Sequence, residues 1–331
     1  MVIDFLKRVK RKFMAALVRS KARREAVKAF EYDLRQFLDG AGALHPQRRE
    51  AAVAEIVMGY HVLEKGLTMP RRRPVFGRPA ATHLMNLIKS FESRFGADDQ
   101  VSHAVSVLRS YSELQKGHCE PLSGLDEFLA AHPNDGAAVE PHVKRDDFFA
   151  KVNAPFPQFA ASRHVVRHFA GKIPNERLMA ALELAQTAPS ACNRQHARVH
   201  VVTDPAVRDR LFAVQGGTRG FGSDVDRVLV VTADLSAIRW AWERHDAYVN
   251  GGIYVMNLAY ALHYNGIAHC ILHWSVPPAA DREAHRILGI PPSEAIVQLL
   301  ACGIPPEEFD VAASPRRKLD TVVSFNGGMG E

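Results

Sequence analysis

The chain has 331 residues, of which 47% are hydrophobic and 24% charged, enough for two domains with cores of their own. No apolar run approaches the ~20 residues that span a bilayer, and basic residues interrupt the start of the chain, so we expect a cytoplasmic protein. The net charge of +6 is confined to residues 1–28, which carry +8, while the remainder sums to −2. Because no basic stripe runs through the body, we expect no nucleic-acid binding.

The first 150 residues are predicted to form an all-helical N-terminal region, with the second domain at 151–331. Apolar residues recur at helical spacing in four segments, residues 1–17, 46–66, 81–94 and 100–115. Residues 134–139 (NDGAAV) have the composition of a loop, and the two prolines that flank Phe156 predict an extended linker.

Residues 1–28 allow two interpretations. As a helix, residues 1–17 place five apolar side chains on one side with basic residues around them: Ile3, Leu6, Val9, Phe13 and Leu17. This pattern suits weak, salt-sensitive contact with an anionic membrane surface. The alternative is that the apolar side packs on the helical region, which the shortness of the stripe and its lack of a tryptophan favour.

The second half alternates strand-like and helical segments, a pattern that predicts a sheet covered by helices. The helices are expected at 175–187, with Asn175 as N-cap, and at 205–213, 246–264 and 280–288; the strands at 198–203, 227–232, 268–274 and 295–302. Helix 246–264 is apolar nearly all round, so we expect it to be buried in the core or in a subunit interface.

Two basic stretches are candidates for a binding site. Residues 162–169 (SRHVVRHF) place Arg163 and Arg167 four apart, so on a helical turn both guanidiniums would point the same way. Two converging Arg side chains suit a phosphate, although the segment taken alone favours a solvated basic face. Residues 314–323 (SPRRKLDTVV) add Arg316 and Arg317, whose meaning depends on whether the fold brings them beside Arg163.

A third stretch, residues 188–195 (APSACNRQ), lies between a predicted helix and a predicted strand. Its small residues would let the backbone approach a flat ligand, and the amides of Asn193 and Gln195 can bond the edges of a heterocycle. A helix–strand loop rich in turn residues is the commoner outcome for such a sequence.

Together these stretches resemble the FMN-dependent nitroreductase family. Its R-x-S-x-[RK]-x-F and A-P-S-x-x-N-x-Q-P-W motifs correspond to residues 163–169 and 188–197. The family's apolar helix that begins with small residues corresponds to residues 251–259, and its G-[LI]-x-x-C strand to residues 266–270. Its G-x-P turn corresponds to residues 303–305, and the basic cluster after that turn to residues 316–318. The motifs occur in the family's order over about half of the chain.

The resemblance implies a three-layer α+β fold with a largely antiparallel central sheet flanked by helices, and a homodimer. It implies an FMN-dependent oxidoreductase that passes hydride from NADH or NADPH to a small organic acceptor in two separate steps. Because the flavin carries that chemistry, no catalytic side chain is assigned.

The resemblance also implies roles for individual residues. Arg163, Arg167 and either Arg316 or Arg317 would hold the FMN phosphate, with His164 beside the ribityl chain. The residues implied at the flavin ring are Pro189, Ser190, Ala191 and Asn193, which would act across the dimer interface, and the backbone around Leu272 and His273.

Departures from the family pattern leave two alternatives open. Val165 replaces the usual Ser, and His273 and Trp274 stand where smaller or acidic residues are common. The alternatives to the oxidoreductase are a flavin enzyme of another reaction type and a non-catalytic binding or scaffold protein.

Other candidate sites carry weaker signals. His269 and His273 have the spacing of metal ligands only on a helix, and the segment is predicted as a strand, so we expect a buried histidine and no metal site. The four cysteines are far apart, which indicates reduced thiols. Glu64 and Lys65, with the basic run at residues 71–73, could form a site in the helical region, but a helix end followed by a solvated loop is the favoured interpretation.

Overall fold

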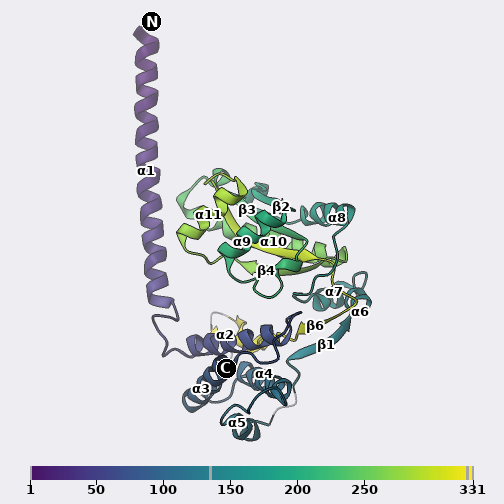
Figure 1. Cartoon of the computed structure of the whole chain (residues 1–331). Coiled ribbons are helices and arrows are strands. Elements are labelled where there is room, and N and C mark those ends of the chain that lie inside the picture. Colours follow the sequence, from purple (N-terminus) through teal and green to yellow (C-terminus); the bar gives the residue numbers. More distant parts are fainter. Residues whose placement is uncertain (1, 134–135, 326–327, 330–331) are drawn as a thin grey trace.

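The computed structural model describes residues 2–133, 136–325 and 328–329, of which residues 2–13, 15, 16, 328 and 329 are described by their backbone alone. Helices α2–α5 gather at one end of the molecule and the main sheet with its helices at the other, with β1 and β6 between them (Figure 1). Within the described residues, no helix is long and apolar enough to cross a membrane.

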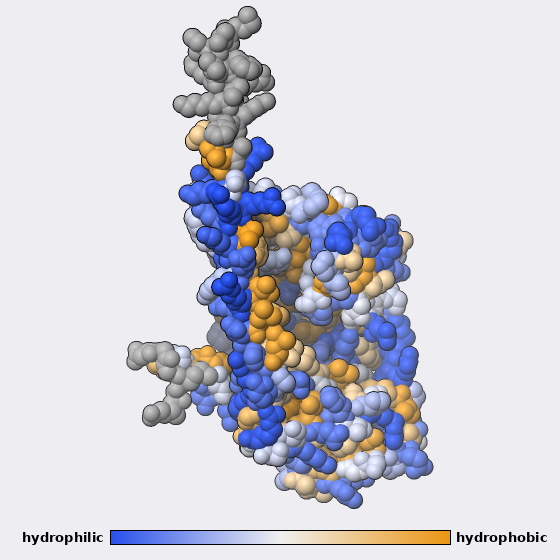
Figure 2. Space-filling model, turned by 90° about the vertical axis from the view of Figure 1, so that its left-hand side faces the viewer, coloured by the Kyte–Doolittle hydropathy of each residue, from blue (hydrophilic) through white to orange (hydrophobic). Residues whose placement is uncertain are grey.

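Helix α1 (Val2–Gly40) is much longer than the predicted 1–17 and extends past the rest of the molecule (Figure 1). It is tied to the body at Asp33, whose carboxylate accepts a hydrogen bond from Arg244 Nε at 2.6 Å. An apolar stripe runs down the helix (Figure 2), formed by Val27, Phe30, Leu34 and Phe37, all exposed. The expected apolar face of residues 1–17 lies mostly outside the side chains that the structure describes, so the membrane contact stays a prediction.

The remaining N-terminal helices pack around one core. They are α2 (Arg49–Leu67), α3 (Arg78–Phe95), α4 (Asp99–Gln115) and α5 (Leu125–Ala131). The core is built from one apolar face of each helix and includes Leu63, Leu84, Leu108 and Phe128, which are almost inaccessible to solvent. The three helical patterns predicted after residue 45 are therefore confirmed. The domain division at residue 150 remains a prediction.

A two-stranded ribbon joins the two halves of the chain. Strand β1 (Val139–Lys144) pairs antiparallel with β6 (Glu308–Ala312), and neither strand was predicted. Two short helices follow β1: α6 (Arg145–Phe149) and α7 (Phe156–Ser162). The predicted extended linker around Phe156 is wrong, because Pro157 lies in the first turn of α7, where its missing N–H breaks no helical hydrogen bond.

The central sheet has the order β2-β3-β5-β4, and each neighbouring pair is antiparallel. Its strands are β2 (Ala197–Val202), β3 (Arg227–Asp234), β4 (Ala268–His273) and β5 (Glu294–Gly303). In β3, Leu229 lies opposite Val201 of β2 and Leu300 of β5. Val228 and Val230 belong to one buried cluster, while Leu229 belongs to the other, as the alternation of side chains along a strand requires.

Helices cover both faces of this sheet and complete three layers. The cluster around Leu229 includes residues of α8 (Asn175–Ala185) and α10 (Asp246–Tyr264), and the opposite cluster includes residues of α9 (Pro205–Gln215) and α11 (Pro278–Leu288). The α+β fold with an antiparallel central sheet is confirmed. The predicted N-cap is off by one residue, since Asn175 begins α8 and Pro174 precedes it.

Short elements complete the chain: η1 (Ala191–Asn193), η2 (Gly222–Asp224), η3 (Leu235–Ala237), η4 (Ala241–Glu243), η5 (Leu319–Thr321), and the paired strands β7 (Ser324–Phe325) and β8 (Gly328–Met329).

Helix α10 buries only one of its faces within the single chain. A Cβ at Gly251 would lie 2.6 Å from Val297 of β5, so the helix packs closely on the sheet there. The opposite face stays accessible, with Val249 57% and Ile253 41% exposed. Burial of this helix within the core of one chain is therefore only half realised, and a subunit interface remains the other predicted possibility.

Candidate functional site

A basic cavity of about 560 Å³ lies where the two halves of the chain meet. It is bounded by the extended segment after α7, by α10 and by the loop after β6, with His61 of α2 at its edge. Four of the residues predicted as a binding site line it: Arg163, His164, Arg167 and Arg316. None of the described residues that line the cavity is an Asp or a Glu. The cavity therefore gathers positive charge without an acidic partner in its wall.

Arg163 and Arg167 reach the cavity from extended backbone. The helical turn considered for them is wrong, because α7 ends at Ser162 and Arg163 has φ −79° and ψ 112°. The segment is fixed to the sheet by Val166, which is fully buried and donates its N–H to the carbonyl of His269 at 3.0 Å. The fold thus brings the two guanidiniums to one cavity through strand-like backbone.

The two arginines are poorly supplied with hydrogen-bond acceptors. Arg167 is 8% exposed, and its guanidinium contacts the thiol of Cys270. The Nε and Nη1 atoms of Arg163 are buried and have no hydrogen-bond partner. Burial, and to a smaller degree the charge of Arg316, lowers the pKa of Arg163. Because buried cationic donors are strongly destabilising when unpaired, this arrangement calls for an anion.

Neutral histidines surround Arg163. Burial and the charge of Arg163 lower the pKa of His263 to about 4 and that of His269 to about 3. Burial also lowers the pKa of His164. The buried histidine predicted at His269 is confirmed, with 1% of its surface exposed. No cluster of ligands suited to a metal ion occurs among the described residues.

The loop after β6 separates the two arginines that the sequence could not distinguish. Arg316 lines the cavity. Arg317 points elsewhere, and its Nη1 donates to Glu50 Oε2 of α2 at 2.8 Å. The structure therefore places Arg316, and not Arg317, beside Arg163.

The other predicted residues do not line this cavity within the single chain. They are Pro189, Ser190, Ala191, Asn193, Leu272 and His273. The loop at 188–195 is nevertheless well held: Ala191 donates its N–H to Asn250 Oδ1 at 2.8 Å, and Arg194 pairs with Glu243 and Asp246 at 2.9 Å. Their predicted role across a dimer interface stays a prediction.

The helix end predicted at Glu64 and Lys65 is confirmed, because α2 ends at Leu67 and the loop that follows is exposed at residues 71–75, but Glu64 and Lys65 themselves are not solvated. Glu64 is 1% exposed, and Lys65 Nζ donates to the carbonyl of Gly217 at 2.6 Å. The sequence carried a signal, because Glu64 follows Tyr60 by four residues and so shares the apolar face of its helix. A carboxylate on such a face needs partners, and this one finds them in the loop that carries Arg316.

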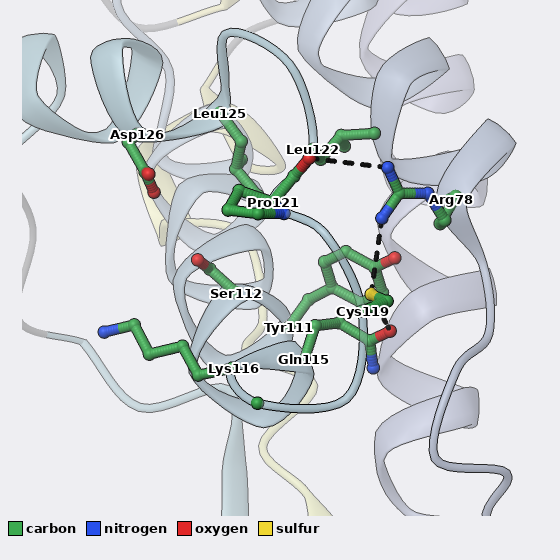
Figure 3. Close-up of a pocket in the computed structure, with 11 residues that line it drawn as sticks. Arg78, Tyr111, Ser112, Gln115, Lys116, Cys119, Pro121, Leu122, Leu125 and Asp126 are labelled. Atoms are coloured by element: carbon green, nitrogen blue, oxygen red, sulfur yellow. Dashed lines mark hydrogen bonds between the residues drawn. The ribbon is translucent and has the colours of Figure 1, made fainter.

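A second cavity, of about 220 Å³, lies in the helical region between α3, α4 and the loop before α5 (Figure 3). Arg78 lies at one side of it, with Nη1 2.7 Å from the carbonyl of Glu120 and 3.3 Å from Cys119 Sγ. Gln115 accepts a hydrogen bond from Cys119 and donates one to the carbonyl of Pro74. These polar groups satisfy one another, so the arrangement braces the loop, whereas in the basic cavity the Nε and Nη1 atoms of Arg163 have no partner.

Comparison with known families bears on the segment that carries the arginines. Residues 160–218 match the model of the Nitroreductase family. This match lies in the C-terminal half of the chain, and the helical N-terminal region lies outside it. No curated protein matches the chain significantly.

Solved structures are similar to the same half. An FMN-dependent nitroreductase from Clostridium difficile R20291 is 20% identical to this chain. The alignment covers 51% of this chain and 98% of that protein, with a TM-score of 0.44. A nitroreductase-like protein from Streptococcus mutans is 18% identical to this chain. The alignment covers 51% of this chain and 97% of that protein, with a TM-score of 0.45. The similarity to the family in sequence is carried by residues 160–218.

Proposed function

We propose that the protein is an FMN-dependent oxidoreductase that transfers hydride from NADH or NADPH to a small organic acceptor. The observation that carries the proposal is the pair of buried, unpartnered guanidinium atoms of Arg163, in a cavity that also holds Arg167 and Arg316. A phosphate monoester supplies the acceptors and the negative charge that these groups lack. The family match of residues 160–218 supports FMN as the molecule that carries this phosphate.

The residues of the chain would bind and orient the cofactor. Arg163, Arg167 and Arg316 would hold its phosphate, and His164, kept neutral by burial, would line the path away from it. When bound, FMN supplies the redox chemistry, since its ring exchanges hydride with a reduced nicotinamide and with an acceptor in turn. No side chain needs to act as acid or base, in agreement with the lack of a catalytic assignment.

We further propose that the active form is a homodimer. The exposed face of α10, with Val249 and Ile253, offers the apolar surface for the interface. Met256 and Tyr260 of the same helix line the basic cavity, so a partner on this face would also border the site. The loop at 188–195 would then serve the site of the opposite subunit.

The experiment is reduction of the purified protein, loaded with FMN, by NADH or NADPH without oxygen. The proposal expects the visible absorbance of the oxidised flavin to bleach and to return when an organic acceptor is added. A flavin that binds but is reduced by neither nucleotide points to another reaction type. A protein that binds no flavin is a non-catalytic member of the family.

A further inference from the structure

We propose that Glu64 of helix α2 is a positioning residue that holds the Arg316 loop at the phosphate-binding cavity. The helical region would then complete the binding site of the nitroreductase domain. This inference rests on the proposed function, because the ligand in question is the phosphate of FMN. Glu64 itself does not line the cavity.

Glu64 is joined to the loop by both carboxylate oxygens. The N–H of Ser314 donates to Oε1 and the hydroxyl of Ser314 donates to Oε2, each at 3.1 Å. On the side of the helical region, the ring of buried His103 lies with Nε2 3.1 Å from Oε1. One buried carboxylate thus links α2 and α4 to a loop 250 residues further along the chain.

The backbone of the loop explains why it needs such an anchor. Ser314 has a φ of 41°, in the left-handed region that non-glycine residues seldom occupy. The next residue, Pro315, further restricts the backbone of Ser314 and favours extended conformations. Strained backbone of this kind persists where surrounding contacts enforce it. The two hydrogen bonds to Glu64 are such contacts.

The strained turn determines where Arg316 lies. Arg316 Nη1 donates to the carbonyl of Ser314, so the side chain folds back over the turn and lines the cavity. If Ser314 relaxes to an extended conformation, the chain leaves the turn in another direction and Arg316 moves with it. Loss of Glu64 would therefore act on phosphate binding through Arg316.

Glu64 is held in the ionised form that accepts both bonds. Burial alone would raise its pKa, but hydrogen bonds from His103, His61 and Ser314 outweigh burial and lower the pKa to about 2. The carboxylate is therefore charged at neutral pH. A glutamine at this position keeps the size but can accept through only one of its two side-chain atoms.

The test compares the affinities of full-length variants for FMN and for riboflavin, which lacks the phosphate. Glu64→Gln should weaken FMN binding about tenfold, the effect of losing one charge-assisted contact, and leave riboflavin binding unchanged. In an Arg316→Ala background, Glu64→Gln should have no further effect on FMN. Glu92→Gln is the matched control, since Glu92 also accepts from a histidine, His132 at 3.0 Å, but lies away from the cavity.

Ser314→Ala is a second variant for the case in which Glu64→Gln fails to fold. It removes one of the two hydrogen bonds from the side of the loop and leaves Glu64 in place. Folded variants that bind FMN as tightly as wild type overturn the proposal. So does an equal loss of FMN and riboflavin binding, which indicates a general structural role. If wild-type protein binds no FMN, the proposed function fails and this inference fails with it, whereas failure in the variants alone leaves the proposed function intact.

Discussion

Replacement of Arg163 by methionine should stabilise the flavin-free protein while it weakens FMN binding. Arg163 has two buried nitrogen atoms, Nε and Nη1, without hydrogen-bond partners. A buried unsatisfied donor costs about 1–3 kcal/mol, and methionine fills similar space without any donor. We expect the free energy of unfolding without flavin to rise by about 1–3 kcal/mol.

The same change removes one charge-assisted contact to the phosphate, worth roughly 1.5–3 kcal/mol. FMN affinity should fall about tenfold to hundredfold. The stabilisation that FMN confers on the protein should shrink in parallel, since ligand binding raises stability in proportion to the logarithm of its affinity.

Thermal unfolding with and without FMN measures both effects. The melting temperature of flavin-free Arg163→Met should rise by roughly 2–4 °C for each kcal/mol gained, and its increase on addition of FMN should be smaller than in wild type. Arg208→Met is the control, because Arg208 donates to Asp209 and to the carbonyl of Val225 and should be needed for stability but not for FMN. A flavin-free Arg163→Met protein that melts below wild type would refute the reasoning.

Three further predictions concern the fold and the assembly. Leu229 is fully buried in the middle of the sheet, so Leu229→Ala should lower the free energy of unfolding, measured in urea, by about 2–5 kcal/mol. A decrease below about 1 kcal/mol, which is typical of a surface substitution, would contradict the described core. The hydrogen bond from Arg244 lowers the pKa of Asp33 from 3.8 to about 2, so the ion pair that anchors α1 is fully formed at pH values above 3.8 and is lost as the pH falls towards 2. Asp33→Asn should therefore speed amide exchange in α1 at neutral pH, and unchanged exchange argues against this anchor. Ile253→Glu should convert the proposed dimer to a 36.7 kDa monomer in light scattering, and a variant that keeps twice that mass places the interface elsewhere.

The central sheet could be predicted because its strands carry their own signal. Residues 227–232 are almost continuously apolar, as expected for a strand covered by helices on both faces, and β3 has the burial to match. Strands β1 and β6 could not be found in this way. β1 contains Pro141 and a left-handed residue, His142, and its partner strand lies about 170 residues away in the sequence. Pairing over such a distance leaves no local pattern.

The candidate site was only partly visible in the sequence. The motif around Arg163 and Arg167 identified a segment that lines the basic cavity, even though its backbone is extended and not helical. A choice between Arg316 and Arg317 requires the position of Glu50, which pairs with Arg317 and draws it away. The role of Glu64 depends on Ser314, and contacts between such distant segments are set by the tertiary fold.

The most direct test of the central claim is equilibrium titration of the wild-type protein with FMN and with riboflavin. Three arginines on the phosphate predict that FMN binds at least about a thousandfold more tightly than riboflavin, because each charge-assisted contact contributes roughly 1.5–3 kcal/mol. Equal affinities for the two flavins, or no binding of either, would contradict the assignment of the basic cavity as the FMN phosphate site.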